Sequence, residues 1–289
     1  MSNFFAEIFT YDFMLRALIV GVLVSLCAAL LGVHLVLKRY SMIGDGLSHV
    51  AFGTLAVALA CNLAPMAVAM PVVILAAFCL LRMSQNGKLK GDAAVALIST
   101  SSLAIGVIAV SLSSGMTTDV YSYMFGSVLA MSADDVTLSI AVSAAVLVLY
   151  GIFYHKIFAI TFDETFARAT GVRVGIYNTL LAVLTAVTIV IGMKIMGALL
   201  ISALLVFPAL TSMRLFKTFR SVVICSAVLC VACFVCGLFV SFAYSFPTGA
   251  SVVLVDLIGF ILFSLIAAAR QKNRNLPEKP RDVFDKGKK

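Results

Sequence analysis

The chain consists of a succession of long apolar segments separated by short polar connections. Its mean hydropathy is +1.12, and 62% of its 289 residues are hydrophobic whereas only 12% are charged. Soluble domains carry roughly a quarter charged residues, so this composition excludes a soluble protein. The apolar segments are also far longer than the roughly 10-residue alternating strands of a membrane barrel. The pattern therefore predicts an all-α, polytopic bundle of transmembrane helices.

Nine segments are predicted to cross the membrane. They are residues 13–37, 41–61, 65–81, 92–113, 136–154, 177–191, 195–213, 222–244 and 251–269. The segments 177–191 and 195–213 are predicted to form a helical hairpin with Gly192, Lys194 and Gly197 at its tip, and an eight-span arrangement follows if this hairpin is partly broken. Residues 119–131 are too few to cross and are predicted to form a surface or re-entrant helix.

The distribution of charge predicts the orientation and the domain boundaries. Positive charge collects after alternate spans, so the positive-inside rule predicts an outer N-terminus and a cytoplasmic C-terminus. We expect a short lead-in at 1–12, a single transmembrane domain at 13–269, and a basic cytoplasmic tail at 270–289. The tail holds eight Lys or Arg residues and three acids, and Pro277 and Pro280 predict that it is disordered near anionic lipid. No cleavable signal peptide and no nucleic-acid partner are expected.

The segment 41–50 places a carboxylate and an imidazole inside a predicted span. Asp45 and His49 are four residues apart, so a helix brings them to one face with their Cβ atoms roughly 5–6 Å apart. Counting about 1.5 Å per residue from the last basic residue places them about 9 and 15 Å into a hydrocarbon core of roughly 30 Å. Ionisable groups at that depth face a partner or a pathway, which predicts a cation site; a pair that only joins two helices is the alternative. Gly44 and Gly46 favour a functional role, because glycine lets the backbone bend or another helix approach.

The other reactive side chains are predicted to have less direct roles. His34 and His155 are expected at the membrane interface, and Lys194 is expected to mark the outer mouth and to extend away from an incoming ion. Asp256, in the last span, either lines the pathway or lies near the outer interface. Six of the seven cysteines lie in apolar segments, so no disulfide is expected. Three of them are spaced as soft-metal ligands, but their apolar surroundings favour a packing role: Cys230, Cys233 and Cys236.

Residues 161–175 form the longest polar connection inside the chain and are predicted to contain a short amphipathic helix. Asp163 and Glu164 lie where helix starts favour acids, and Gly171 lies where helix ends favour glycine. A helix lying at the membrane surface would have the same pattern, so the spacing alone leaves its role open. The predicted apolar edge of this helix consists of Phe162, Phe166 and Ala169.

Several stretches, in this order and spacing, resemble the metal-type permeases of ABC transporters, the membrane subunits of zinc and manganese importers. The stretches are GVHLVLKRYSMIGDGLSHVAFG at 32–53, GDAAVALI at 91–98, DVYSYMFGSVL at 119–129, DETFARATG at 163–171, GALLISALLVFP at 197–208 and PTGA at 247–250. The resemblance covers nearly the whole chain between residues 13 and 269, and no single motif carries it.

The resemblance implies a fold, partners and a site. It implies the ABC importer permease fold, a dimer of this chain or of close relatives in a prokaryotic plasma membrane, a cytosolic ATPase that binds ATP and Mg²⁺, and an outer metal-binding protein. It implies that Asp45 and His49 contact the transported Zn²⁺ or Mn²⁺, with no cofactor bound by this chain. Two such pairs would supply up to four N/O ligands, enough for tetrahedral zinc and also suited to manganese. The residues that match the helix docking on the ATPase are Asp163, Glu164, Phe166, Ala167, Ala169 and Gly171.

The expected function is therefore a zinc import permease, with a manganese or iron importer as the alternative. Gly91 favours zinc, because many relatives, especially manganese-like ones, have a Glu-Asp pair where this chain has Gly91-Asp92. The chain has no G-x-x-x-x-G-K-[ST] motif, so ATP hydrolysis is expected on another subunit. A proton-coupled carrier is a further alternative. An intramembrane metalloprotease lacks its H-E-x-x-H motif here, and a cobalamin or siderophore permease would not need ion ligands at depth.

Overall fold

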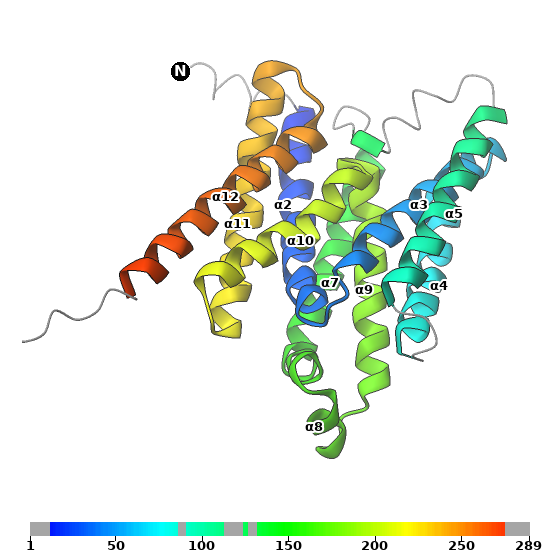
Figure 1. Cartoon of the computed structure of the whole chain (residues 1–289). Helices are drawn as coiled ribbons and strands as arrows, with labels where there is room; N and C mark the ends of the chain where they lie inside the picture. Colours follow the sequence, from blue (N-terminus) through cyan, green and yellow to red (C-terminus); the bar gives the residue numbers. More distant parts are fainter. Residues whose placement is uncertain (1–11, 86–90, 113–123, 127–131, 275–289) are drawn as a thin grey trace, which may run out of the picture.

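The computed structural model describes residues 12–85, 91–112, 124–126 and 132–274, which fold almost entirely into helices (Figure 1). The helices are α2 (Asp12–Leu37), α3 (Ser41–Ala60), α4 (Pro65–Gln85), α5 (Gly91–Leu112), α7 (Ala133–Phe162), α8 (Glu164–Ala169), α9 (Val174–Met196), α10 (Ala198–Leu215), α11 (Phe219–Tyr244) and α12 (Thr248–Arg274). Within these residues, every helix except the six-residue α8 is long and apolar enough to cross a membrane, which makes nine candidate spans. The predicted all-α, polytopic fold is confirmed.

Some helix boundaries differ from the predicted ones. Helix α7 extends from Ala133 to Phe162, well beyond the predicted 136–154. It begins early because the Ser132 Oγ accepts a hydrogen bond from the Asp135 amide at 3.2 Å and the Asp135 carboxylate accepts one from the Ser132 amide at 3.4 Å, a capping box. Helix α12 continues to Arg274, so the first residues of the predicted tail are helical.

Other predicted segments lie largely outside the described residues. These are most of the lead-in at 1–12, most of the tail at 270–289, and all of the predicted re-entrant helix at 119–131 except 124–126.

Single residues in left-handed conformations separate several of the helices. Helices α9 and α10 are joined only by Gly197, whose φ of 87° suits glycine. A Cβ on Gly197 would lie 2.4 Å from the amide nitrogen of Gly126, so the chain also needs glycine for space. Arg39, with a φ of 62°, turns α2 into α3, and Ser245, with a φ of 54°, ends α11. The predicted hairpin is therefore two distinct helices with a one-residue break.

Helix α10 occupies the centre of the bundle. It contacts α2, α3, α9, α11 and α12, while α3, α4 and α5 pack together on one side of the molecule (Figure 1). Helix α8 lies at the end of the molecule opposite the α9–α10 and α11–α12 connections. A Cβ on Gly32 would lie 1.9 Å from the carbonyl oxygen of Leu205, so α2 and α10 approach backbone to backbone.

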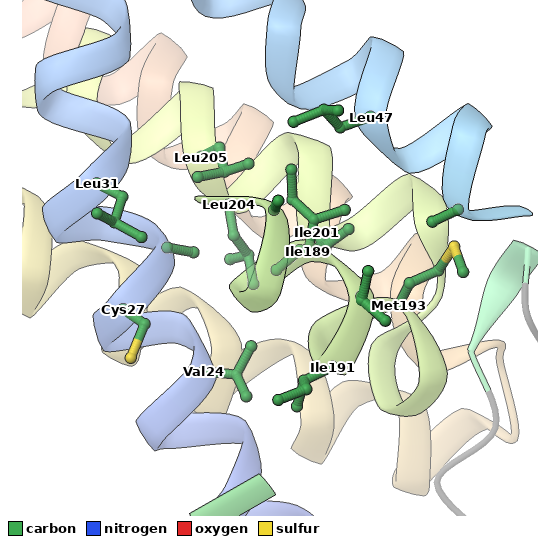
Figure 2. Packing of buried hydrophobic residues seen from close by; sticks show 14 of the residues in the cluster. Val24, Cys27, Leu31, Leu47, Ile189, Ile191, Met193, Ile201, Leu204 and Leu205 are labelled. Atoms are coloured by element: carbon green, nitrogen blue, oxygen red, sulfur yellow. The ribbon is translucent and has the colours of Figure 1, made fainter. Parts of the chain in front are cut away.

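The core is apolar and is shared by helices that are far apart in the sequence. Figure 2 shows side chains of α2, α3, α9 and α10 interdigitating around this centre. The labelled members are Val24, Cys27, Leu31, Leu47, Ile189, Ile191, Met193, Ile201, Leu204 and Leu205. Large apolar side chains also cover the outside of the bundle, including Leu97 on α5, Ile152 on α7 and Leu265 on α12. An apolar exterior of this kind is suited to hydrocarbon.

Candidate functional site

The structure brings Asp45 and His49 together on one face of α3. The Asp45 Oδ2 and His49 Nε2 atoms are 3.6 Å apart, which is longer than a hydrogen bond. Two ligand atoms bound about 2.1 Å from one tetrahedral metal ion are about 3.4 Å apart. The pair is therefore spaced to share one cation after only a small side-chain movement.

Gly44 and Gly46 lie inside the continuous helix α3 and act by allowing close packing. A Cβ on Gly44 would lie 2.9 Å from the Leu205 Cδ1 atom, and a Cβ on Gly46 would lie 2.6 Å from the Val95 Cγ1 atom. These contacts hold α10 and α5 against α3 on either side of Asp45. Of the two predicted roles of these glycines, the structure shows the close approach of neighbouring helices.

A third polar group adjoins the pair and was not identified from the sequence. Ser202 of α10 interacts with the Asp45 carboxylate through its side chain, and its hydroxyl also donates to the Ala198 carbonyl at 2.8 Å. Its hydroxyl proton can turn to either acceptor. The available signal was weak: Ser202 is the single polar side chain between Ala198 and Pro208.

The pair is partly open to the exterior of the single chain. The side chains of Asp45 and His49 are 48% and 31% exposed, although α3 is a candidate span. Ionisable groups at membrane depth face protein or a water-filled cavity rather than lipid. Among the described residues, this pair included, no group of three or more His, Cys, Asp or Glu side chains is arranged to hold a metal ion.

His34, which is expected at the membrane interface, is buried between helices. Its Nδ1 atom is 2.8 Å from the Thr161 hydroxyl and its Nε2 atom is 2.9 Å from the Tyr150 hydroxyl. The Thr161 hydroxyl donates its proton to the Ile157 carbonyl at 2.7 Å, so His34 Nδ1 must donate and Nε2 must accept from Tyr150. The physical reason is the length of α7, whose last turns cover this end of α2. His155, in contrast, is exposed on α7.

Two further charged groups inside spans have neighbours that the sequence did not indicate. Lys194 does not extend away from the bundle but forms an ion pair with Asp135, because the capped first turn of α7 lies beside the end of α9. Asp256 is 3% exposed and is therefore buried among helices. It packs between α12 and α11 with the Cys233 thiol as a polar neighbour, and its Oδ2 atom has no hydrogen-bond partner. A role of Asp256 in the pathway stays a prediction.

The three closely spaced cysteines do not converge on one point. Cys230 is buried and its thiol donates to the Ser25 carbonyl at 3.2 Å, whereas Cys236 is exposed. Cys233 faces α12, where a Cβ on Gly259 would be 3.7 Å from its sulfur atom. These contacts agree with the packing role.

The short helix α8 forms where the acids and the glycine of 161–175 predict it. The Asp163 Oδ1 atom accepts hydrogen bonds from the amides of Thr165 and Phe166 at 2.8 and 2.9 Å, and Gly171 has a φ of 83° just after the helix. Six residues cannot form a stable helix alone, so this cap and the packing of Ala167 hold α8 in place. Ala167 is buried with Ile160 and Val174 and therefore anchors the helix.

Exposed aromatic side chains flank Asp163: Phe166 lies on α8, whereas Phe162, predicted to share its helix, is the last residue of α7. Phe162 and Phe166 are 59% and 65% exposed. Glu164 instead forms an ion pair with Lys38 at 2.7 Å and accepts a hydrogen bond from the Asn178 amide at 3.0 Å. Partial burial alone would raise the pKa of Glu164, but these two hydrogen bonds outweigh it and hold the pKa below its ordinary value.

Comparison with known proteins identifies relatives along almost the entire chain. The model of the ABC 3 transport family matches residues 10–268. The manganese import system permease protein ScaB of Streptococcus gordonii is 28% identical over 267 residues, 92% of this chain and 96% of that protein. The manganese transport system membrane protein MntC of Halalkalibacterium halodurans is 28% identical over 265 residues, 91% of each. The structure of PsaBC from Streptococcus pneumoniae in complex with Fab superposes with a TM-score of 0.84 at 29% identity, over 95% of this chain and 99% of that one. These matches confirm the resemblance found in the sequence.

Proposed function

Since this chain belongs to the ABC 3 transport family and is a membrane permease for metal ions, we propose that the ion crosses at Asp45 and His49. The observation that carries this proposal is the 3.6 Å spacing of a carboxylate oxygen and an imidazole nitrogen on one face of a candidate span. Such a pair replaces part of the hydration shell that a divalent ion loses inside a membrane. Ser202 would orient the Asp45 carboxylate from the neighbouring helix α10.

We propose that the complete site lies between two copies of the chain. The partly exposed face of α3 that carries the pair needs a protein or water-filled neighbour at membrane depth. A two-fold axis beside this face would place two carboxylates and two imidazoles around one ion, which satisfies four-coordinate geometry.

The proposed substrate is a divalent first-row metal ion. Carboxylate and imidazole ligands suit both zinc and manganese. The names of the relatives favour manganese, whereas Gly91 beside Asp92 favours zinc, and iron is the remaining alternative. The experiment below therefore measures manganese and zinc side by side.

We also propose that transport is driven by a separate cytosolic ATPase docked on α8. The exposed Phe166 side chain offers an apolar anchor on α8, which is held in place by its cap and by Ala167, and the exposed Phe162 at the end of α7 offers a second one. An outer metal-binding protein would deliver the ion, and the chain would lie in the plasma membrane of a prokaryote, as its bacterial relatives suggest. The chain itself would carry out no chemical step.

The test is uptake of manganese-54 and zinc-65 into proteoliposomes that contain the chain with its co-purified ATPase and its binding protein. We expect ATP-dependent uptake that falls at least tenfold in His49→Ala and in Asp45→Ala. His155→Ala is the matched control, because it removes an exposed imidazole elsewhere and should leave uptake unchanged.

The outcomes separate the parts of the proposal. Uptake of one metal alone identifies the substrate and keeps the mechanism. Normal uptake by the double variant Asp45→Ala/His49→Ala refutes the assignment of the site. Uptake that ignores ATP and follows a pH gradient refutes the ATP-driven mechanism in favour of a proton-coupled carrier.

A further inference from the structure

Three polar side chains from distant parts of the sequence meet beside α8. Lys38 follows the last residue of α2, Glu164 is the first residue of α8, and Asn178 lies in α9. The Lys38 ammonium is 2.7 Å from the Glu164 Oε1 atom and also donates to the Asn178 Oδ1 atom, while the Asn178 amide donates to the same Glu164 oxygen at 3.0 Å. Each member thus contacts both of the others, and the cluster joins three segments of the chain.

The cluster is anchored by the burial of Lys38. The Lys38 side chain is 5% exposed, whereas the Glu164 side chain is 39% exposed. A nearly buried ammonium needs its partners, because water is not available to replace them. If α8 moves, Lys38 therefore tends to move with the carboxylate rather than to release it.

Lys38 is joined rigidly to the start of α3. The turn at 38–40 is closed by backbone hydrogen bonds from the Tyr40 amide to the Leu35 carbonyl at 2.7 Å and from the Ile43 amide to the Tyr40 carbonyl at 3.0 Å. Helix α3 begins at Ser41, and Asp45 lies in its second turn. The path from the carboxylate of α8 to the candidate metal ligand is one ion pair, one tight turn and little more than one turn of helix.

We infer that Lys38 is a positioning residue that connects movement of α8 to the Asp45 end of α3. The inference rests on the proposed function, because it assigns the connection between the docked ATPase and the metal site. A displacement of α8 by the ATPase would pull on Glu164, then on Lys38, and so on the first turns of α3. Asn178 holds both charged groups at a fixed position beside α9 through its two hydrogen bonds.

The test measures how many metal ions are transported for each ATP hydrolysed. Manganese-54 or zinc-65 uptake and phosphate release are measured in the same proteoliposomes, for wild type, Lys38→Met, Glu164→Gln and the double variant. Co-purification of the ATPase reports assembly. Lys194→Met is the matched control, because it breaks another lysine–carboxylate ion pair, with Asp135, at the other end of α9.

We expect Lys38→Met to lower the number of ions per ATP at least tenfold while the ATPase still co-purifies. Lys38→Arg, which keeps the cation, should retain most of the wild-type ratio, and Lys194→Met should retain all of it. Because the two residues form one connection, the double variant should be no worse than Lys38→Met alone. A residue needed only for folding would lower the yield of complex without changing the ratio.

Two results would overturn the inference: a wild-type ratio in Lys38→Met, or losses in the single variants that multiply in the double variant. If Lys38→Met does not assemble, Glu164→Gln, which removes the negative charge but keeps a side-chain oxygen beside Lys38, gives the same test from the other partner. A wild-type complex that takes up neither metal would overturn the proposed function and this inference together. Wild-type uptake with an unchanged ratio in every variant would overturn the inference alone.

Discussion

The ion pair between Lys38 and Glu164 predicts that removing Glu164 destabilises the protein more than removing Lys38 does. Removing Glu164 leaves an ammonium that is 5% exposed without its anion, whereas removing Lys38 leaves a carboxylate that is 39% exposed and can be hydrated. Unpaired buried charges cost several kcal/mol, but a lysine can escape by losing its proton. At pH 7.5, removing the proton from a lysine with an ordinary pKa of about 10.4 costs about 4 kcal/mol. This value is the upper limit for the stability that is lost when Glu164 is removed.

We therefore expect Glu164→Ala to cost about 2–4 kcal/mol of stability and Lys38→Met about 1 kcal/mol. The methionine refills the space of the lysine stem, and Glu164 keeps its hydrogen bond from Asn178 at 3.0 Å. At roughly 2 °C per kcal/mol for a chain of this size, the apparent Tm of Glu164→Ala should lie several degrees below that of Lys38→Met. Thermal unfolding of the two purified variants in detergent measures this difference.

The pH dependence of stability distinguishes the Glu164→Ala variant from the Lys38→Met variant. Burial already lowers the pKa of Lys38 in the intact protein, although the Glu164 carboxylate opposes that shift. Without Glu164 the folded state binds fewer protons than the unfolded state at alkaline pH. The stability of Glu164→Ala should therefore rise with pH, by up to about 1.4 kcal/mol per unit, until the pH passes the unfolded pKa of lysine. Lys38→Met should show no such recovery. Equal Tm values at pH 7.5, or a deficit in Glu164→Ala that persists unchanged at pH 9, would refute this reasoning.

Three further predictions concern helix packing, a buried acid and the exposed face of α8. Gly32→Ala should prevent the approach of α2 and α10 and lower the yield of folded protein, because its Cβ would lie 1.9 Å from the Leu205 carbonyl oxygen. Gly151→Ala should be tolerated, because nothing lies within 4 Å of its Cβ. Equal yields of the two variants in size-exclusion chromatography would contradict this prediction. Asp256→Asn should retain metal uptake and an unchanged or higher Tm, since the Oδ2 atom has no partner to lose; abolished uptake would place Asp256 in the pathway. Phe166→Ala should leave Tm unchanged, because the ring is 65% exposed in the single chain. It should reduce co-purification of the ATPase about tenfold or more, because aromatic side chains that become buried in an interface dominate binding energies. Full co-purification would exclude Phe166 as an anchor.

Local features of this protein were predictable from the sequence. The need for about 20 apolar residues per crossing marks the spans, and the helical period places Asp45 and His49 on one face without further information. Asp163 and Gly171 predict the two ends of α8, because the chemistry of helix caps depends only on neighbouring backbone groups.

Contacts between helices were not predictable in the same way. When a helix is hydrophobic all round, its periodicity no longer shows which side packs inward. The sequence therefore gave no indication that Ser202 adjoins Asp45 or that Lys38 meets Glu164. For the same reason the sequence did not indicate that His34 is buried, since nothing in α2 shows that α7 covers it.

The hydrogen bonds of His34 also constrain how this bundle can change shape. Both ring nitrogen atoms form hydrogen bonds with α7, and the ring lies tilted against that of Phe219 at the start of α11, with 5.3 Å between the ring centroids. Sliding α2 along α7 would break both hydrogen bonds in a place that water does not reach. Helices α2 and α7 should accordingly move together as one rigid unit, against which α3 and its neighbours rock. The opening of the site to one side of the membrane and then the other would occur by movement between α3 and α10. The side chains that meet there are almost entirely apolar and can exchange partners at little cost.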